Sequence, residues 1–312
     1  MSIASSVHLV FAAPDITAST GALVAVNGTP VRQIESAAGR FLAGTPQRKR
    51  VIGSILLAWP YALAQLGFPS KGGATEYRLQ DADGQIIDLK VDHENTALAS
   101  TLYPRSEHGR ADPAWEPGTF VKIITGTGIG LSIALPSFFD PGETALAKAI
   151  SNAAEQVTAH AHSPLLIDVR GNTGGDFLKT MPLIDAIAGS ARRQVVVLVD
   201  KFTFSAAIVF VAILKHRLGD RLRILGEDMG DGLAFFAEGG LLDLPASRAA
   251  VRYSSAFHDW KTGCIDETTP PEIAHHIVAV GSLDLDGPCI AEPTVAKADG
   301  DLYRHILTRL TS

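Results

Sequence analysis

The sequence predicts an α/β fold with a mainly parallel sheet, preceded by a smaller α+β region. Between residues 119 and 226, short apolar runs alternate with longer stretches of helical periodicity, an order typical of parallel strands joined by right-handed crossovers. Two of these runs, residues 164–169 and 194–200, have the composition of buried strands. Residues 101–117 are polar and rich in Pro and Gly, so we divide the chain into a region 1–112 and a core 113–312.

In the first region, alternating apolar residues indicate strands, and apolar residues at helical spacing indicate helices. We expect Pro60 to interrupt one of these helices. The predicted elements are a strand at 21–31 that turns at Asn27 and Gly28, helices at 32–42 and 50–66, and a hairpin of strands 75–79 and 85–91.

In the core, the same patterns predict strands at 120–124, 129–135, 164–169, 194–200 and 221–226, and helices at 143–160, 176–189 and 204–218. The glycines between Gly126 and Gly130 resemble a phosphate-binding loop. They lead into a strand and not into a helix, so we interpret them as a hairpin turn.

Composition excludes some classes of partner. The 312 residues are 46% hydrophobic and 19% charged, which is ample for a buried core. A net charge of −6 provides no basic field for nucleic acid. No apolar run reaches the roughly 18 residues that a membrane-spanning helix needs. We therefore expect neither nucleic acid nor a membrane span.

Cysteines and histidines point to no metal or other cofactor, because no cluster has metal-ligand spacing. Cys264 and Cys289 form either one disulfide or two free thiols, and their spacing leaves both open. The first 13 residues lack a positively charged start, so they make a poor signal peptide.

Ser205 is the predicted nucleophile. It follows the buried strand 194–200 and opens a helix, a position that exposes the hydroxyl and aims helix N–H groups at developing negative charge. The alternative is a structural helix cap, because serine is a preferred N-cap residue.

The loop after the other buried strand is the predicted oxyanion hole. Glycine allows the closest approach of backbone to a substrate carbonyl, so we expect Gly174 and Gly175 to donate N–H groups together with Ala206. An ordinary tight turn is the alternative. We interpret Asp168 and Arg170, just before this loop, as structural.

Four segments of the chain resemble the motifs of the tail-specific, or C-terminal processing, serine peptidases and of the tricorn core protease. The first two are the specific ones, and the last two are degenerate. The segments are Leu166 to Gly175, Val196 to Ala207, Gly226 to Gly232 and Ile265 to Ile273. The resemblance covers roughly residues 118–310 and implies a ClpP/crotonase-like core, with a PDZ-like or divergent region before it.

The resemblance leaves the general base open. Many members carry a catalytic Lys where this chain has Asp231, and Ile208 replaces the usual Glu. The tricorn-like branch uses a His with an orienting acid, and Glu267, or else Asp266, falls where that acid would lie. The candidate bases are His8, in the most upstream strand, and His258, beside an Asp and a Trp. His275 and His276 would face opposite sides of a strand and make no metal pair.

The resemblance implies a serine endopeptidase that hydrolyses peptide or protein substrates through an acyl-enzyme on Ser205. The alternative is a catalytically impaired homologue that binds peptides or partner proteins, and a crotonase-like acyl-CoA enzyme is a third. Family members are often exported, which implies the periplasm or cell envelope, while the poor signal peptide leaves the cytoplasm open. A homo-oligomer is among the open assembly states.

Overall fold

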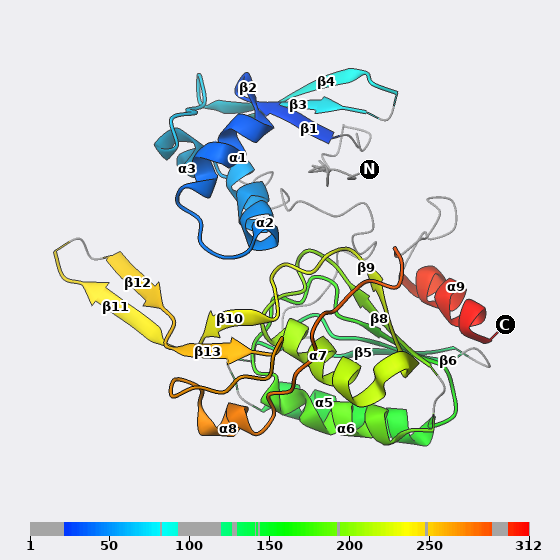
Figure 1. Cartoon of the computed structure of the whole chain (residues 1–312). Helices are drawn as coiled ribbons and strands as arrows, with labels where there is room; N and C mark the ends of the chain where they lie inside the picture. Colours follow the sequence, from blue (N-terminus) through cyan, green and yellow to red (C-terminus); the bar gives the residue numbers. More distant parts are fainter. Residues whose placement is uncertain are drawn as a thin grey trace. The chain divides into compact units, whose positions relative to one another are not determined.

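The computed structural model describes residues 22–81, 83–92, 120–126, 130–140, 142, 144–191, 194–246, 249–288 and 299–311. The chain divides into two compact units, residues 1–109 and residues 110–312 (Figure 1). The predicted boundary near Asp112 lies outside the described residues and stays a prediction.

The smaller unit is an antiparallel sheet with helices packed against it. Asn27 and Gly28 both adopt positive φ angles, 50° and 79°, and form the tight turn that the sequence predicts. The strand order is β2-β1-β3-β4. The elements are β1 (Ala22–Val26), β2 (Thr29–Pro30), α1 (Val31–Gly39), α2 (Pro46–Leu57), α3 (Pro60–Gln65), β3 (Ala74–Gln80) and β4 (Ile86–Asp92).

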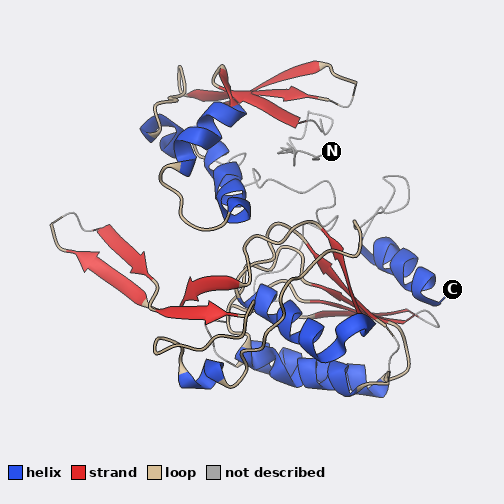
Figure 2. Ribbon diagram, viewed as in Figure 1, coloured by secondary structure: helices blue, strands red, loops and turns tan. Residues whose placement is uncertain are grey.

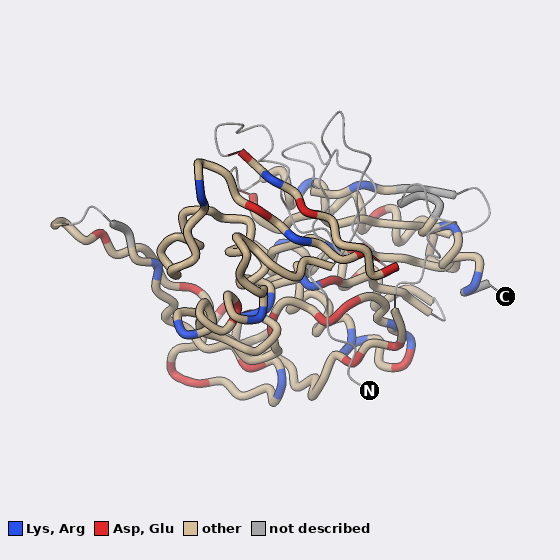
Figure 3. The backbone as a smooth tube through the Cα atoms, turned by 90° about the horizontal axis from the view of Figure 1, so that it is seen from above, with Lys and Arg blue, Asp and Glu red and all other residues tan. Residues whose placement is uncertain are grey.

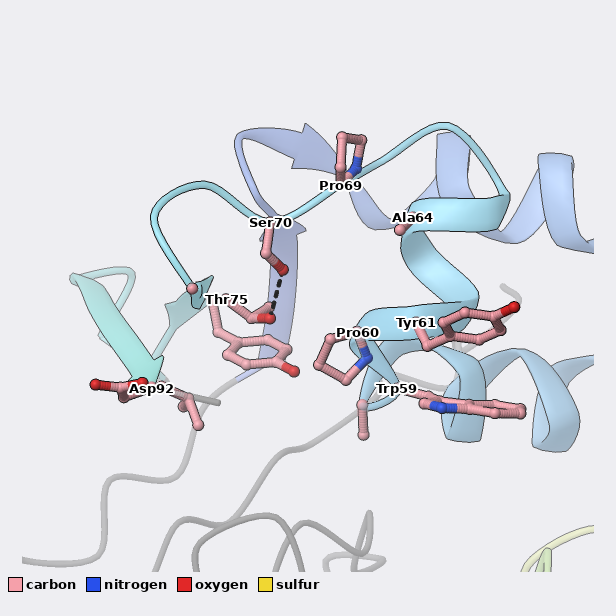
Figure 4. Close-up of a pocket in the computed structure, with 12 residues that line it drawn as sticks. Trp59, Pro60, Tyr61, Ala64, Pro69, Ser70, Thr75 and Asp92 are labelled. Atoms are coloured by element: carbon pink, nitrogen blue, oxygen red, sulfur yellow. Dashed lines mark hydrogen bonds between the residues drawn. The ribbon is translucent and has the colours of Figure 1, made fainter. Parts of the chain in front are cut away.

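The predicted interruption at Pro60 divides the second helix into α2 and α3. A pocket of about 550 Å³ opens where α3 begins, between that helix and the ends of β3 and β4 (Figure 4). The rings of Trp59 and Tyr61 lie 6.2 Å apart at this pocket. It contains none of the predicted site residues.

The larger unit is a layered α/β structure. Its sheet has five strands in the order β5-β6-β7-β8-β9, of which β5 and β6 are antiparallel and the remaining neighbours parallel. This arrangement matches the predicted mainly parallel α/β core. The strands are β5 (Lys122–Gly126), β6 (Gly130–Ala134), β7 (Leu165–Asp168), β8 (Val195–Val199) and β9 (Leu222–Gly226).

Three crossover helices cover one face of this sheet, and a fourth helix covers the other (Figure 2). The crossovers are α5 (Ala145–Ala159), α6 (Met181–Gly189) and α7 (Ala206–Leu218). Their face buries the main core. The opposite face packs Leu166 and Val196 against Leu302 and Ile306 of α9 (Asp299–Thr311). β7 and β8 are therefore buried on both sides, which explains their unbroken apolar runs.

Two further strand pairs follow β9, and the sequence predictions did not include them. β10 (Ala234–Ala237) pairs with β13 (Ala256–Asp259), and the chain between them forms a hairpin of β11 (Gly240–Leu244) and β12 (Ala249–Tyr253). One face of that hairpin carries Leu242 opposite Val251, and both side chains are exposed.

The remaining helix, α8 (Pro271–Ala274), corrects the interpretation of the paired histidines. His275 caps this helix and His276 follows in a turn, so the two do not alternate across a strand. Pro271 starts the helix, because a proline at the first helical position loses no hydrogen bond.

Charged residues of both signs are scattered along the described chain (Figure 3). None of the helices in the described part of the chain has the length and apolar character that crossing a membrane requires.

Candidate active site

Two loops meet where β7 and β8 end: the glycine loop, residues 169–175, follows β7, and the serine loop, residues 200–205, follows β8. The strands are parallel and in register, with Asp168 beside Leu198, so their carboxyl ends deliver the following loops to the same edge of the sheet. The backbone N–H of Phe204 donates to the carbonyl of Asn172 at 2.9 Å. The hydroxyl of Thr203 donates to the carbonyl of Val169 at 3.1 Å. These bonds fix the serine loop against the glycine loop.

A buried carboxylate, that of Asp200, strengthens this connection. Its Oδ1 accepts from the backbone N–H of Gly171 at 2.9 Å and from those of Phe202 and Thr203 at 3.0 Å. Burial raises the pKa of Asp200, and the hydrogen bonds from Gly171 and Phe202 oppose that shift. One side chain thus holds backbone from both loops.

Asn172 shapes the glycine loop from within. Its amide nitrogen donates to the carbonyl of Leu135 at 2.8 Å, and its Oδ1 accepts from the N–H of Gly174 at 2.9 Å. The side chain is fully buried, so it is fixed in place between β6 and the loop.

Ser205 lies at the start of α7 in a strained backbone conformation, with φ 54° and ψ −123°. Such angles are almost confined to glycine and cost a serine about 1 to 3 kcal/mol. Ser205 is the N-cap residue of α7 by position, but its side chain makes no capping hydrogen bond, so the hydroxyl does not act as the cap. A strained serine between a strand and a helix is also a feature of the nucleophile turns of serine hydrolases.

The glycine loop lies directly against this serine. A Cβ on Gly174 would lie 2.8 Å from the Cβ of Ser205, and one on Gly175 would lie 2.0 Å from the carbonyl atoms of Phe138. Both glycines have positive φ, 105° and 132°. Only glycine fits either position, because any side chain would displace the backbone beside the serine.

Of the three predicted oxyanion donors, Gly175 and Ala206 have free N–H groups. Neither donates to another residue in the described part of the chain. The N–H of Gly174 is already occupied by Asn172, which narrows the predicted oxyanion hole to Gly175 and Ala206. Gly174 contributes the close approach and not a donor.

The two candidate bases and the candidate orienting acid lie in different parts of the chain. His258 is buried in β13, and no hydrogen bond joins it to Ser205. His8 lies outside the described residues. Glu267 is exposed in the loop before α8. Among the described residues, no side chain hydrogen-bonds to the hydroxyl of Ser205.

Asp231 lies near the nucleophile turn, because the N–H of the preceding Gly230 donates to the carbonyl of Thr203 at 2.9 Å. Its Oδ1 accepts from the N–H of Gly232. This carboxylate occupies the position that the peptidase motif gives to a lysine, so the chain has no ammonium group there.

Asp168 and Arg170 form a buried ion pair, 2.7 Å between Arg170 Nη2 and Asp168 Oδ2, as expected of structural residues. The hydroxyl of Tyr303, on α9, donates to the same oxygen at 2.6 Å. Sequence reasoning missed Tyr303, since nothing local links it to a strand 135 residues earlier.

No protein-family model matches the chain, and no curated protein matches its sequence. Among solved structures, the photosystem II D1 C-terminal processing protease is 14% identical, with a TM-score of 0.43 over 94% of this chain and 68% of that one. Mature CPAF is 13% identical, with a TM-score of 0.48 over 98% of this chain and 82% of that one.

A putative S41 protease from Bacteroides fragilis is 11% identical, with a TM-score of 0.38 over 98% of this chain and 82% of that one. The first is named a C-terminal processing protease and the third a putative S41 protease, and the motifs resemble those of the C-terminal processing peptidases. TM-scores below 0.5 support no inference about what this chain does, so its function is inferred from the geometry of the site.

Proposed function

We propose that this protein is a serine peptidase that cleaves peptide bonds through an acyl-enzyme on Ser205. The single observation that carries the proposal is the strained Ser205, whose side chain caps no helix and which lies in contact with Gly174. Strain of this kind persists only where the surrounding structure enforces it, and it concentrates at functional sites.

The chemistry follows from the two loops. Ser205 Oγ attacks the carbonyl carbon of the scissile bond, and its proton passes to a base. The carbonyl oxygen becomes an oxyanion and accepts hydrogen bonds from the N–H groups of Gly175 and Ala206. The C–N bond then breaks, the amine leaves with the proton, and water hydrolyses the ester in a second cycle of the same steps.

Preorganisation is the main contribution of the scaffold. Because Asp200 and Asn172 fix both loops before substrate arrives, little reorganisation is needed when the oxyanion forms. Losing one such donor typically costs 100-fold to 1,000-fold in kcat, so the two N–H groups account for a large share of the expected rate.

The runner-up is a catalytically impaired peptide-binding protein on the same scaffold. Two observations favour it: Asp231 replaces the motif lysine, and the Ser205 hydroxyl has no hydrogen-bonded base among the described residues. Such a protein would bind peptide beside the glycine loop without cleaving it.

Labelling with a fluorophosphonate probe and turnover of peptides and peptide esters distinguish the two functions. The peptidase should gain one covalent adduct, located at Ser205 by mass spectrometry, and Ser205→Ala should abolish both labelling and turnover. Ser151→Ala, at an exposed position of α5, is the matched control and should behave as the parent. A parent that binds peptide but neither labels nor cleaves would favour the binding protein.

A further inference from the structure

Three exposed carboxylates lie beside the end of the glycine loop, and we call them the acidic cluster. Asp176 directly follows Gly175, Glu238 follows β10, and Glu272 is in the first turn of α8. The Asp176 and Glu238 side chains are each 45% exposed, so both are open to a ligand from solvent. The negative charges of Asp176 and Glu272 both act on Glu238, which places the three close together.

Packing around one buried ring brings these three segments together. Phe177, the neighbour of Asp176, meets the ring of Trp260 edge-on at 5.5 Å and that of His276 at 6.1 Å. Trp260 follows β13, the partner strand of β10, and His276 follows α8. The loop after Gly175, the β10–β13 pair and α8 therefore converge on Phe177, and each carries one member of the acidic cluster.

A buried histidine is aimed at the cluster. The His258 side chain, in β13, is 3% exposed, and its Nε2 lies 3.4 Å from Glu238 Oε1. Neither ring nitrogen makes a hydrogen bond to a described residue, and the same holds for the indole nitrogen of Trp260. Burying polar nitrogens without partners is costly, and folded proteins usually satisfy such atoms with water or a ligand. The chain thus leaves hydrogen-bonding capacity unused behind the carboxylates.

The charges of the cluster favour a cation. Burial raises the pKa of Glu238, and the charges of Glu272 and Asp176 raise it further, because like charges repel. Burial also lowers the pKa of His258 below its usual 6.5, so its ring is neutral at pH 7 and repels no cation. The nearby cation is Lys179, whose Nζ lies 3.9 Å from Asp176 Oδ2. One ammonium group against three carboxylates leaves an excess of negative charge.

Glu238 is also held in an unfavourable backbone conformation. Its φ is 51°, in the left-handed region that residues with a Cβ seldom adopt. Gly239 fixes the chain next to it, because a Cβ there would lie 2.1 Å from the carbonyl oxygen of Tyr253. Residues other than glycine in such positions concentrate at ligand-binding and active sites. A glutamate here, where glycine or asparagine would be less strained, is consistent with a role for its carboxylate.

An organic cation suits this cluster better than a metal ion. Within the described ranges, no group of three or more His, Cys, Asp or Glu side chains is arranged to hold a metal. Lysine and arginine carry their charge on a long flexible stem, so they can reach carboxylates that are too far apart to bind one ion together. A peptide supplies such side chains.

The cluster lies near the bond that the enzyme would cleave. Asp176 is the next residue after Gly175, whose N–H we assign to the oxyanion hole, and neighbouring Cα atoms are about 3.8 Å apart. An extended peptide advances about 3.3 Å per residue. A side chain of the substrate that reaches Asp176 therefore belongs to a residue within about three positions of the scissile bond.

We propose that the acidic cluster is the subsite for a lysine or arginine side chain of the peptide, within about three residues of the scissile bond. This inference rests on the peptidase function proposed above and names the class of peptide that the site takes. The ammonium or guanidinium group donates hydrogen bonds to the carboxylates of Glu238, Glu272 and Asp176. Its charge keeps Glu238 ionised, and Nε2 of His258 lies behind that carboxylate as a second partner.

Binding can be measured without turnover in Ser205→Ala. The probes are two fluorescein-labelled alanine peptides of equal length, one with a single lysine and the other with a single norleucine, which has the same stem without the charge. Fluorescence anisotropy should show about 10-fold tighter binding of the lysine peptide at low salt. About 0.5 M NaCl should reduce that ratio, because it screens exposed charges. Equal affinities for the two peptides at low salt would overturn the proposal.

Variants of the cluster locate the preference. In the same background, Glu238→Gln and Glu272→Gln should each reduce the lysine-to-norleucine ratio to about 3-fold, and the double variant to below about 2-fold. Glu155→Gln is the matched control. It removes an exposed carboxylate near the carboxyl end of α5, at the opposite edge of the sheet, and should keep the parental ratio. An unchanged ratio in the double variant would overturn the proposal, because the preference would then reflect the net charge of −6 and not the cluster.

Turnover separates this proposal from the peptidase function. Mass spectrometry of the products of the unsubstituted protein should place each cut within about three residues of a lysine or arginine. Cuts spread without regard to basic residues would overturn the subsite and leave the peptidase function intact. A protein that cleaves nothing, but prefers the lysine peptide and loses that preference in the double variant, would refute the peptidase function and retain the subsite as a peptide-binding site.

Discussion

The corner around Ser205 and the corner around His258 differ in how completely their polar groups are satisfied. At the first, the buried Asp200 side chain accepts a hydrogen bond from the backbone, and the buried Asn172 side chain both accepts one and donates one. At the second, both nitrogens of His258 and the indole N–H of Trp260 have no partner among the described residues. The hydrogen bonds of the first corner therefore fix its backbone, whereas the second corner retains unused hydrogen-bonding capacity.

Gly175→Ala should have the largest effect, because it disrupts the rigid corner directly. The added Cβ would lie 2.0 Å from the backbone of Phe138, which is hydrogen-bonded to Gly174 and Asp176 of the same loop. We expect a loss of about 3 to 5 kcal/mol in the free energy of unfolding and no turnover. Urea unfolding curves would measure this loss of stability.

Gly171→Ala is the control for that variant. Gly171 also has positive φ, 73°, but no atom lies within 4 Å of its added Cβ. It should therefore lose only about 1 to 2 kcal/mol, the cost of left-handed backbone alone. Equal losses in the two variants would mean that the close approach at Gly175 is unimportant.

Asp200→Ala should be next in size. It leaves three backbone N–H groups without their acceptor, and we expect unfolding to become easier by about 2 to 4 kcal/mol. Asp259→Ala, which removes similar bonds from the turn after β13, should cost less because that carboxylate joins no second loop. The difference between the two variants measures the cross-link between the loops.

Ser205→Gly should stabilise the protein while abolishing turnover. Glycine adopts φ 54° without strain, so the free energy of unfolding should rise by about 1 kcal/mol. Ser205→Ala keeps the strain and has no cap to lose, so its stability should stay near that of the parent. A destabilised Ser205→Gly would show that the backbone angle is not strained.

His258→Leu should have the smallest effect on stability at pH 7, within about 1 kcal/mol and in the stabilising direction, because it removes unpaired buried nitrogens. The folded-state pKa of His258 is lower than the unfolded one, so the unfolded state binds more protons as the pH falls through 6.5. Acid should thus destabilise the parent more than the variant, as unfolding curves at pH 7 and pH 5 would show.

The fold and the nucleophile corner were predictable because their signals are local. Unbroken apolar runs identified β7 and β8, and parallel strands necessarily bring Gly174 and Ser205 to one edge. The contact between Glu238 Oε1 and His258 Nε2, 3.4 Å apart, was not predictable. It depends on the register of β10 and β13, which an inserted hairpin separates in sequence, and Glu267 was chosen by motif position alone. Which N–H groups remain free was not predictable either, because the Asn172 side chain that occupies the N–H of Gly174 is oriented by its bond to the carbonyl of Leu135, 37 residues earlier.

The bond from Tyr303 to Asp168 has a consequence for the order of events during synthesis. Asp168 ends the strand that carries the glycine loop, and its second oxygen gains this donor only when α9 docks. A nascent chain that has emerged through α7 already contains every atom of the proposed nucleophile and oxyanion hole, but the sheet face beneath them is still bare. Full maturation of the site is thus delayed until the ribosome has translated about 100 further residues, which takes roughly 5 to 20 seconds at about 5 to 20 residues per second.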